Sequence, residues 1–374
     1  MWSGKSLYRM DFRITIIIFL LMAVSLLVIS SMTQESETFT FFTPLVRSQL
    51  QWFGIGLLVF FFLAGFDYHN FFSWASIFYI IMILLLIGVY LTKPIQSVHR
   101  WYRIPFLNMN IQPSEYTKIV LVLTLGWLLE KKGKWVGDKT TSIQVLFLVG
   151  IPFFLILKQP DLGTALVLYP IMFTMCYFAG VNKITLRLMS ILGIIALFFV
   201  SLMFLGFLSH EKMKPMVTCF LKEYQYERLN PDTYHQKAAQ ISIALGGAKG
   251  EGWHKSSFAG RKWLPAAHTD SVFAAYGEEF GFIGVLFLLF LFYSLIYCSF
   301  QVVAVAKDSF GKFLSSGIAV YLAMHIIVNI AMMCGFLPIT GVPLLLMSYG
   351  GNSVVTTMAS LGILQSIYTR RFMF

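Results

Sequence analysis

Long apolar runs separated by short polar links dominate the chain. The runs occupy residues 14–31, 48–66, 72–91, 114–129, 142–157, 162–180, 186–208, 271–300, 314–336 and 342–368. A helix needs roughly 20 apolar residues to cross a bilayer core about 30 Å thick. The strands of a membrane barrel would alternate apolar and polar residues, and these runs do not. The pattern predicts an all-α polytopic membrane protein with about ten transmembrane helices, organised as a single domain, 1–374.

Composition supports this interpretation. Hydrophobic residues make up 57% of the 374 residues and charged residues 12%, against roughly 45–50% and about 25% in soluble domains. The chain therefore lacks the polar surface of a soluble globular protein. Its net charge of +11 is explained by cationic cytoplasmic loops, and no nucleic-acid partner is predicted. The cysteines at 176, 219, 298 and 334 are widely spaced, so they indicate neither a disulfide framework nor a zinc site.

The distribution of Lys and Arg predicts an orientation. If the N-terminus is cytoplasmic, the short inner segments hold most of the cations: Lys5, Arg9, Arg13, Lys131, Lys132, Lys134, Lys139, Lys183, Arg187, Lys307, Lys312, Arg370 and Arg371. Such an excess is typical of cytoplasmic loops. Both termini are then cytoplasmic, and residues 209–270 form a large extracytoplasmic loop between the seventh and eighth helices. Most of the chemically unusual residues fall on this outer face.

Two opposite charges open the fourth apolar run. A charge inside a membrane costs roughly 2.5–3.5 kcal/mol on insertion scales, so each one calls for a partner or a function. Glu115 and Lys118 are three residues apart, share a helix face and can pair. They form either an internal ion pair or one wall of an outward cavity, in which Lys118 would face anionic ligand groups.

Asp161 lies in a second outer link, 158–164. It follows a proline and precedes an apolar run, which suits a residue that caps the start of a helix. A cap is the favoured interpretation, and lining the same outward cavity is the alternative.

The segment 263–284 is the most informative part of the chain. Asp270 stands where the long outer loop enters an apolar helix. Small residues follow near the same helix face: Ala274, Gly277, Gly281 and Gly284. Such a face lets another helix or a lipid-linked substrate approach closely. A carboxylate at this position suits a general base, and the alternative is a helix N-cap made by Thr269 or Asp270.

Three further patterns have structural interpretations. His325 and Asn329, four residues apart in a predicted span, are expected to hydrogen-bond between helices. The small polar residues of 348–353 fall inside the last predicted helix and suit a close helix contact or a break that lines a cavity. The glycines of 246–252 have the wrong spacing for a dinucleotide-binding loop, and no P-loop occurs.

Several blocks together resemble the SEDS family (shape, elongation, division and sporulation), most closely its RodA branch. The blocks are His99 to Trp101, Gln112 to Lys118, Lys158 to Thr164, Gln240 to Gly250, Leu264 to Asp270 with Gly277 to Gly281, and Gly335 to Ser353. They occur in order over most of the chain. The family usually has Phe after its motif Asp and Glu after its motif Pro, where this chain has Ser271 and Ala266.

The resemblance implies a SEDS fold and a peptidoglycan glycosyltransferase. Such an enzyme polymerises lipid II on the outer face of the bacterial cytoplasmic membrane, during cell elongation and shape maintenance. The family's catalytic Asp falls on Asp270, and His268 and Thr269 beside it become candidates for contacting substrate. The implied partners are lipid II, membrane lipid, a class B penicillin-binding protein and other membrane proteins of the elongation complex.

The chemistry of these residues agrees with that reaction. An acceptor sugar hydroxyl must lose a proton as it attacks the donor's anomeric carbon, and Asp270 could accept it. The leaving group is a lipid pyrophosphate, which needs charge neutralisation. A single carboxylate favours one inverting displacement over a covalent double displacement. The candidates to neutralise the pyrophosphate are the cations Arg100, Arg103, Lys118 and Lys158, and a divalent cation, Mg or Mn, could assist. Glu115 and Asp161 are also expected to line the site.

Two other functions fit an outward polar cavity in a bundle of membrane helices. One is a transporter that flips the same lipid-linked precursor. The other is a non-catalytic scaffold that only positions a penicillin-binding protein. Loss of glycan synthesis on removal of the Asp270 carboxylate would separate the enzyme from both.

Overall fold

The computed structural model describes residues 9–33, 40–94, 98–104, 109–204 and 233–372, with a few isolated positions between 207 and 230. Its long helices are α2 (Phe12–Met32), α3 (Pro44–Gly65), α4 (Asn70–Gly88), α5 (Pro113–Lys132), α6 (Lys139–Lys158), α7 (Leu162–Ala179), α8 (Lys183–Phe204), α12 (Val272–Val305), α13 (Ser309–Met333) and α14 (Gly351–Thr369). Shorter elements are α11 (Tyr234–Leu245), the 3₁₀ turns η1 (Val89–Leu91) and η2 (Gly133–Trp135), and the strands β1 (Tyr102–Ile104) and β2 (Met109–Ile111). Every predicted apolar run is helical over most of its length.

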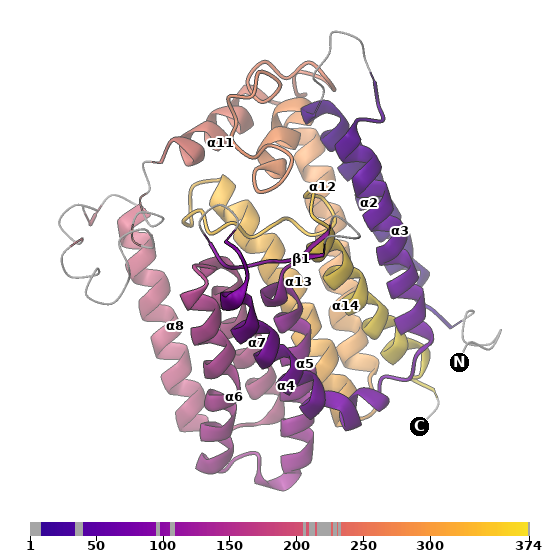
Figure 1. The fold of residues 1–374 in the computed structure, drawn as a ribbon, viewed down its shortest axis with the longest axis vertical. Coiled ribbons are helices and arrows are strands. Elements are labelled where there is room, and N and C mark those ends of the chain that lie inside the picture. The colour runs from indigo at the N-terminus through magenta and orange to yellow at the C-terminus, as the bar shows by residue number, and fades with distance from the viewer. Residues whose placement is uncertain are drawn as a thin grey trace.

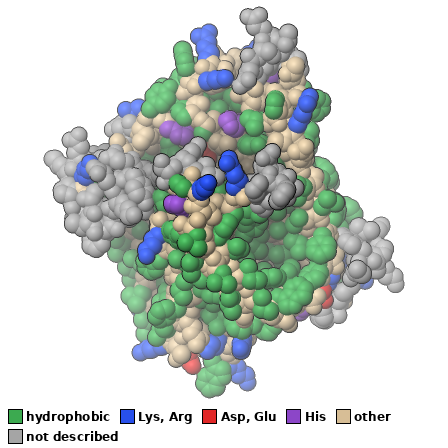
Figure 2. Space-filling model, viewed as in Figure 1, with side chains coloured by type: hydrophobic (Ala, Val, Ile, Leu, Met, Phe, Trp, Pro, Cys, Tyr) green, Lys and Arg blue, Asp and Glu red, His purple; other side chains and the backbone are tan. Residues whose placement is uncertain are grey.

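Eight of these helices are long and apolar enough to cross a membrane: α2, α3, α4, α6, α7, α8, α12 and α13. On the face drawn in Figure 2, hydrophobic side chains form a broad band, with Lys and Arg above it and along its lower edge. An apolar belt bounded by cations is the surface expected against lipid. The protein is a multi-pass membrane protein, as the sequence predicts.

α5 and α14 fall outside that group of eight and lie inside the bundle. α3 packs along α14, α4 along α5, α12 along α13, and α13 along α7 (Figure 1). Most side chains of α5 and α14 are buried, including several polar ones. Polar groups at membrane depth are tolerated in this position because neighbouring helices supply hydrogen-bond partners.

The first and last described segments meet at one end of the bundle (Figure 1). Gln365 of α14 exchanges two hydrogen bonds with the backbone of Asp11, at 2.8 and 3.0 Å. The Arg371 guanidinium donates to the carbonyl oxygen of Arg9 at 3.1 Å. α11 and residues 246–271, together called the cap, lie at the opposite end (Figure 1). Much of the predicted outer loop before residue 233 lies outside the described residues.

The cap docks on a break in α12 at Gly281. The backbone there (φ 62°, ψ −167°) lies in a region that essentially only glycine adopts. Amides of residues 251–252 donate to the carbonyl oxygens of 278–279 at 2.9 and 3.0 Å. A Cβ on Gly281 would overlap the backbone of Gly250, so both positions need glycine for close approach. The small face predicted near Asp270 is therefore covered at Gly281 by the chain's own cap and not by substrate.

Two stretches differ from the sequence prediction. The last apolar run predicts a helix from 342, but α14 begins only at Gly351, and residues 342–350 form turns and extended backbone. The apolar side chains of 344–347 are buried inside the protein. Their high hydropathy therefore reflects this burial, although the segment is not a membrane helix. β1 and β2 pair antiparallel, Tyr102 opposite Ile111, in a link for which no strand was predicted.

Candidate active site

Asp270 lies at the end of the cap, just before α12. Ser271 takes the N-cap position of this helix, and its side chain makes no capping hydrogen bond. The Thr269 hydroxyl donates to the carbonyl oxygen of Ala266 at 3.3 Å. The N-cap of α12 is therefore neither Thr269 nor Asp270, and the alternative in which one of them caps the helix is wrong.

Asn329 of α13 fixes the backbone at Asp270. Its amide group donates to the carbonyl oxygens of Asp270, at 3.0 Å, and Val342, at 2.8 Å. The side chain is completely buried. Asn329 was predicted to hydrogen-bond between helices, but both partners lie outside helices. The bridge joins α13 to the cap and to the segment that precedes α14.

The two residues before Asp270 are held by the same segment. The Ser348 hydroxyl donates to the carbonyl oxygen of Thr269 at 2.6 Å, and the backbone amide of Tyr349 donates to that of His268 at 2.8 Å. The Tyr349 ring also lies edge-on to the His268 imidazole, with centroids 6.1 Å apart. The backbone carbonyl oxygens of residues 268–270 are thus held by Asn329 and by the segment before α14.

Two imidazoles lie within electrostatic reach of the Asp270 carboxylate. Burial lowers the pKa of His235, in α11, and of His268, while the negative charge of Asp270 opposes the shift in both. Both rings are therefore predominantly neutral at neutral pH. The Nε2 atom of His235 lies 2.6 Å from the Ser271 hydroxyl. The serine that replaces the usual Phe at this position thus forms a polar contact with α11.

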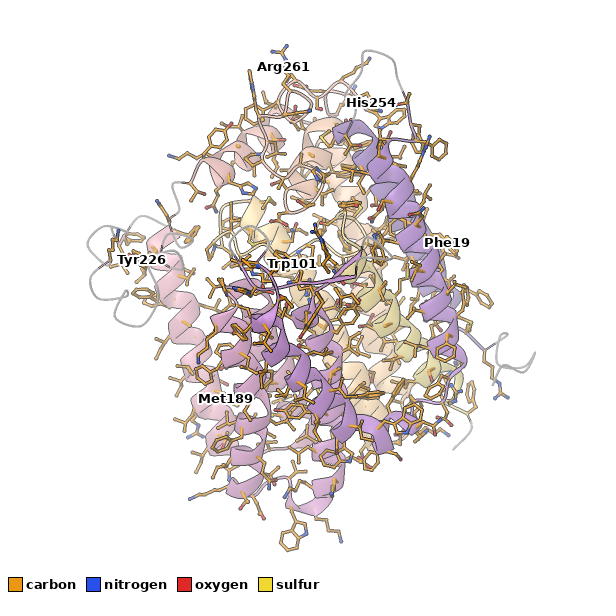
Figure 3. All side chains as sticks on the ribbon, viewed as in Figure 1. Phe19, Trp101, Met189, Tyr226, His254 and Arg261 are labelled. Atoms are coloured by element: carbon orange, nitrogen blue, oxygen red, sulfur yellow. The ribbon has the colours of Figure 1, made fainter. Side chains whose placement is uncertain are left out.

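The other two carboxylates near the start of α12 hold the cap in place. Glu278 accepts a hydrogen bond from the backbone amide of Phe258 at 2.7 Å. Glu279 accepts from the amide of His254 at 3.1 Å and from the Ser31 hydroxyl of α2. Both carboxylates are buried. Figure 3 shows His254 high in the cap, above the bundle. Glu278 and Glu279 are therefore structural groups that join α12 to the cap, and Glu279 also bonds to α2.

Glu115 and Lys118 form the ion pair predicted from their spacing. The Lys118 Nζ atom lies 2.9 Å from Glu115 Oε1 and 2.9 Å from Nε2 of His325 in α13. It also lies 5.4 Å from the centroid of the Tyr321 ring. The Lys118 side chain is 0% exposed. Its ammonium group faces these partners inside the bundle, and not the outward cavity that the other interpretation required.

Asp161 and Arg100 perform structural tasks around the link between α6 and α7. Asp161 caps α7, accepting from the backbone amide and hydroxyl of Thr164 at 3.3 and 3.0 Å, and from the Ser114 hydroxyl at 2.8 Å. Arg100 donates to the backbone carbonyl oxygen of Gln159 at 2.8 Å and to that of Pro160. The favoured cap interpretation of Asp161 is confirmed.

A cavity of about 960 Å³ opens between the cap and the link from α2 to α3. It reaches His268, two residues before Asp270. Its volume is within the range of about 300–1,000 Å³ of small-molecule sites. Arg103 and Lys158 are exposed but do not line it. The lining residues are Met32, Thr33, Thr40 to Leu45, Arg47, Ala259, Lys262 and Leu264 to His268.

Candidate metal ligands do not gather in the described ranges. There, no group of three or more His, Cys, Asp or Glu side chains could hold a metal ion. Cys176, Cys298 and Cys334 are free thiols.

Comparison with known proteins decides the family. The model described as "Cell cycle protein", which covers FtsW, RodA and SpoVE, matches residues 7–372. The chain belongs to the FtsW/RodA/SpoVE family. It is 33% identical to peptidoglycan glycosyltransferase MrdB of Escherichia coli K12 over 302 residues, which is 80% of this chain and 79% of MrdB.

Solved structures agree with this FtsW/RodA/SpoVE assignment. A structure described as "Structural coordination of polymerization and crosslinking by a peptidoglycan synthase complex" aligns over 100% of both chains, with a TM-score of 0.78 and 25% identity. A mutant of the rod shape determining protein RodA from Thermus thermophilus aligns over 99% of both, with a TM-score of 0.72 and 23% identity. The SEDS fold predicted from the sequence blocks is confirmed.

The sequence of this FtsW/RodA/SpoVE member did not indicate that two residues lie at the candidate site. Arg47 lines the cavity, yet in the sequence it is only one of several outer cations. Its position four residues after Thr43, the N-cap of α3, could have placed it in the first helical turn. Asn329 was recognised as a hydrogen-bonding residue, but the sequence carries no signal that its partner is the backbone of Asp270.

Proposed function

We propose that this protein is a peptidoglycan glycosyltransferase that polymerises lipid II into glycan strands. Membership of the FtsW/RodA/SpoVE family and the similarity to MrdB support this class of reaction. The observation that carries the proposal is the setting of Asp270. Its backbone is held by Asn329, the N-cap of its helix is Ser271, and the cavity reaches His268, two residues before it.

Asp270 is the proposed general base. The hydroxyl oxygen of the acceptor sugar attacks the anomeric carbon of the donor, and the hydroxyl proton passes to the Asp270 carboxylate. The bond between that carbon and the pyrophosphate oxygen breaks, and its electron pair leaves on the pyrophosphate. One such displacement inverts the anomeric centre. General-base catalysis typically contributes about 10²–10⁴-fold to a rate.

The other candidate residues divide into two groups. His268 and Thr269 stand next to the base and are proposed to contact the sugars. Arg103 and Lys158 are exposed cations and stay candidates for contacts to the rest of the substrate. The remaining candidates support the site from inside the bundle, because their polar atoms bond to other protein groups: Arg100, Glu115, Lys118 and Asp161.

The cap is proposed to face the outside of the cytoplasmic membrane, with both chain ends in the cytoplasm. The excess of Lys and Arg in the links at the opposite end supports this orientation. A reporter inserted at Lys255, in the cap, should be reached by an impermeant reagent in intact cells. Reaction only after the membrane is permeabilised would overturn the orientation.

A crosslinking partner is part of the proposal. The aligned structure is described in terms of both polymerization and crosslinking by one complex. A class B penicillin-binding protein, which crosslinks the new glycan, would supply the second activity in cell elongation.

Reconstitution tests the proposed function. The purified protein, with its partner and lipid II in detergent, should form glycan strands that a muramidase degrades. In vesicles with labelled lipid II, glycan should form without transfer of lipid II from one leaflet to the other. Transfer of lipid II between leaflets without glycan synthesis would favour a transporter. Partner binding without either activity would favour a scaffold. Either result would overturn the polymerase.

A further inference from the structure

The cations first expected to meet the pyrophosphate are not the ones at the cavity. Lys118 is fully buried between Glu115 and His325, and Arg100 bonds to backbone carbonyl groups. Arg103 and Lys158 lie outside the cavity lining. A dianionic leaving group beside Asp270 would therefore need other positive groups.

Two exposed cations line the cavity from different walls. Arg47 comes from the first turns of α3, and Lys262 comes from the cap. Neither has an ion pair with a described residue. Arg261, next to Lys262, points away above the cap (Figure 3) and is not part of the lining.

We propose that this cavity binds the pyrophosphate of the lipid-linked donor, with Arg47 and Lys262 as its phosphate-binding side chains. This inference rests on the proposed polymerase. Arg presents a planar fork of donors that suits two phosphate oxygens at once, and Lys acts as a compact charge. As the bond to the anomeric carbon breaks, negative charge grows on the leaving oxygen, and the two cations stabilise it.

The start of α3 adds to the positive potential of the cavity. Thr43 is the N-cap and Pro44 the first helical residue, and both belong to the cavity lining. The N-terminus of a helix carries roughly half a positive charge and attracts phosphate groups. A 22-residue helix that points its N-terminus into a cavity with two cations favours an anionic ligand.

The same cavity has an apolar side. Phe41, Leu45, Leu264 and Pro265 contribute to the lining, and Phe42 is 57% exposed. An isoprenoid attached to the pyrophosphate could follow these side chains toward lipid, because apolar surface is buried on both partners. A free inorganic pyrophosphate would leave the apolar side of the cavity exposed to water. The lining therefore favours a lipid-linked pyrophosphate.

Binding of undecaprenyl pyrophosphate tests the inference without catalysis. Protein in nanodiscs should bind it more tightly than undecaprenyl monophosphate. Arg47→Gln and Lys262→Gln should each weaken binding about tenfold, as expected for loss of one charge-assisted contact. Arg47→Lys and Lys262→Arg should recover part of it. The matched controls are Lys249→Gln and Lys255→Gln, exposed cap cations outside the lining.

The outcomes separate the inference from the proposed function. Unchanged binding in both Gln variants would overturn the inference, and so would an equal loss in the two controls. If the wild-type protein polymerises lipid II while the Gln variants keep their KM, only the pyrophosphate assignment fails. If the wild-type protein binds the ligand as described but makes no glycan, the polymerase fails instead.

Discussion

Asp270→Asn should reduce glycan polymerisation by about 10²–10⁴-fold, the usual contribution of a general base. Asparagine keeps the size and hydrogen-bonding capacity of the side chain but cannot accept a proton at neutral pH. Because the carboxylate is not the N-cap of α12, the fold should be retained. The measurement is the initial rate of lipid II consumption by the purified complex.

Asp138→Asn is the matched control for this variant. Asp138 also precedes a helix, α6, without a capping bond from its side chain, and it lies at the other end of the bundle. It should leave the rate unchanged. A wild-type rate for Asp270→Asn would show that the carboxylate is not the base. A large fall in thermal stability would show instead that its task is structural.

Lys118→Met should destabilise the protein by about 3–5 kcal/mol, the cost of leaving a buried charge without its partner. The variant would strand Glu115, whose second carboxylate oxygen already has no hydrogen-bond partner among the described residues. The measurement is the unfolding midpoint in detergent, compared with Lys139→Met, which removes an exposed cation from the first turn of α6.

The double variant Glu115→Lys with Lys118→Glu reverses the pair. It should recover part of the lost stability and activity, though not all, because a lysine at 115 would no longer reach His325 in the same way. One result would contradict the ion-pair interpretation of Lys118. If Lys118→Met unfolds like the wild type while its KM for lipid II rises, Lys118 meets the substrate phosphate.

The helices could be predicted because their signals are local. Runs of apolar residues fix the spans, Pro113 begins α5, and Asp161 caps α7. The same local signals failed at 342–350, where apolar side chains are buried without forming a helix. Hydropathy reports the removal of a side chain from water, and it does so equally for a membrane helix and for a segment packed inside the bundle.

Only those parts of the candidate site that depend on local spacing could be predicted from the sequence. Sequence spacing correctly paired Glu115 with Lys118, since three residues along a helix bring them together. Nothing local distinguished Asp270 as a cap from Asp270 as a base. The start of α12 at Val272 excludes Asp270 as the helix N-cap, and the contacts that hold the Asp270 loop come from Asn329 and Ser348, about 59 and 79 residues away. Long-range backbone contacts of this kind leave no periodic trace in a sequence.

The two hydrogen bonds between Asp11 and Gln365 have a practical consequence for engineering. Since the Gln365 side chain bonds to the backbone of Asp11, domains attached near these two positions would share a very small volume. Halves of a split fluorescent protein, one on each end, would then assemble within a single molecule at millimolar effective concentration. Their brightness would report, in living cells, whether the first and last helices of an individual molecule are still in contact at this end of the bundle.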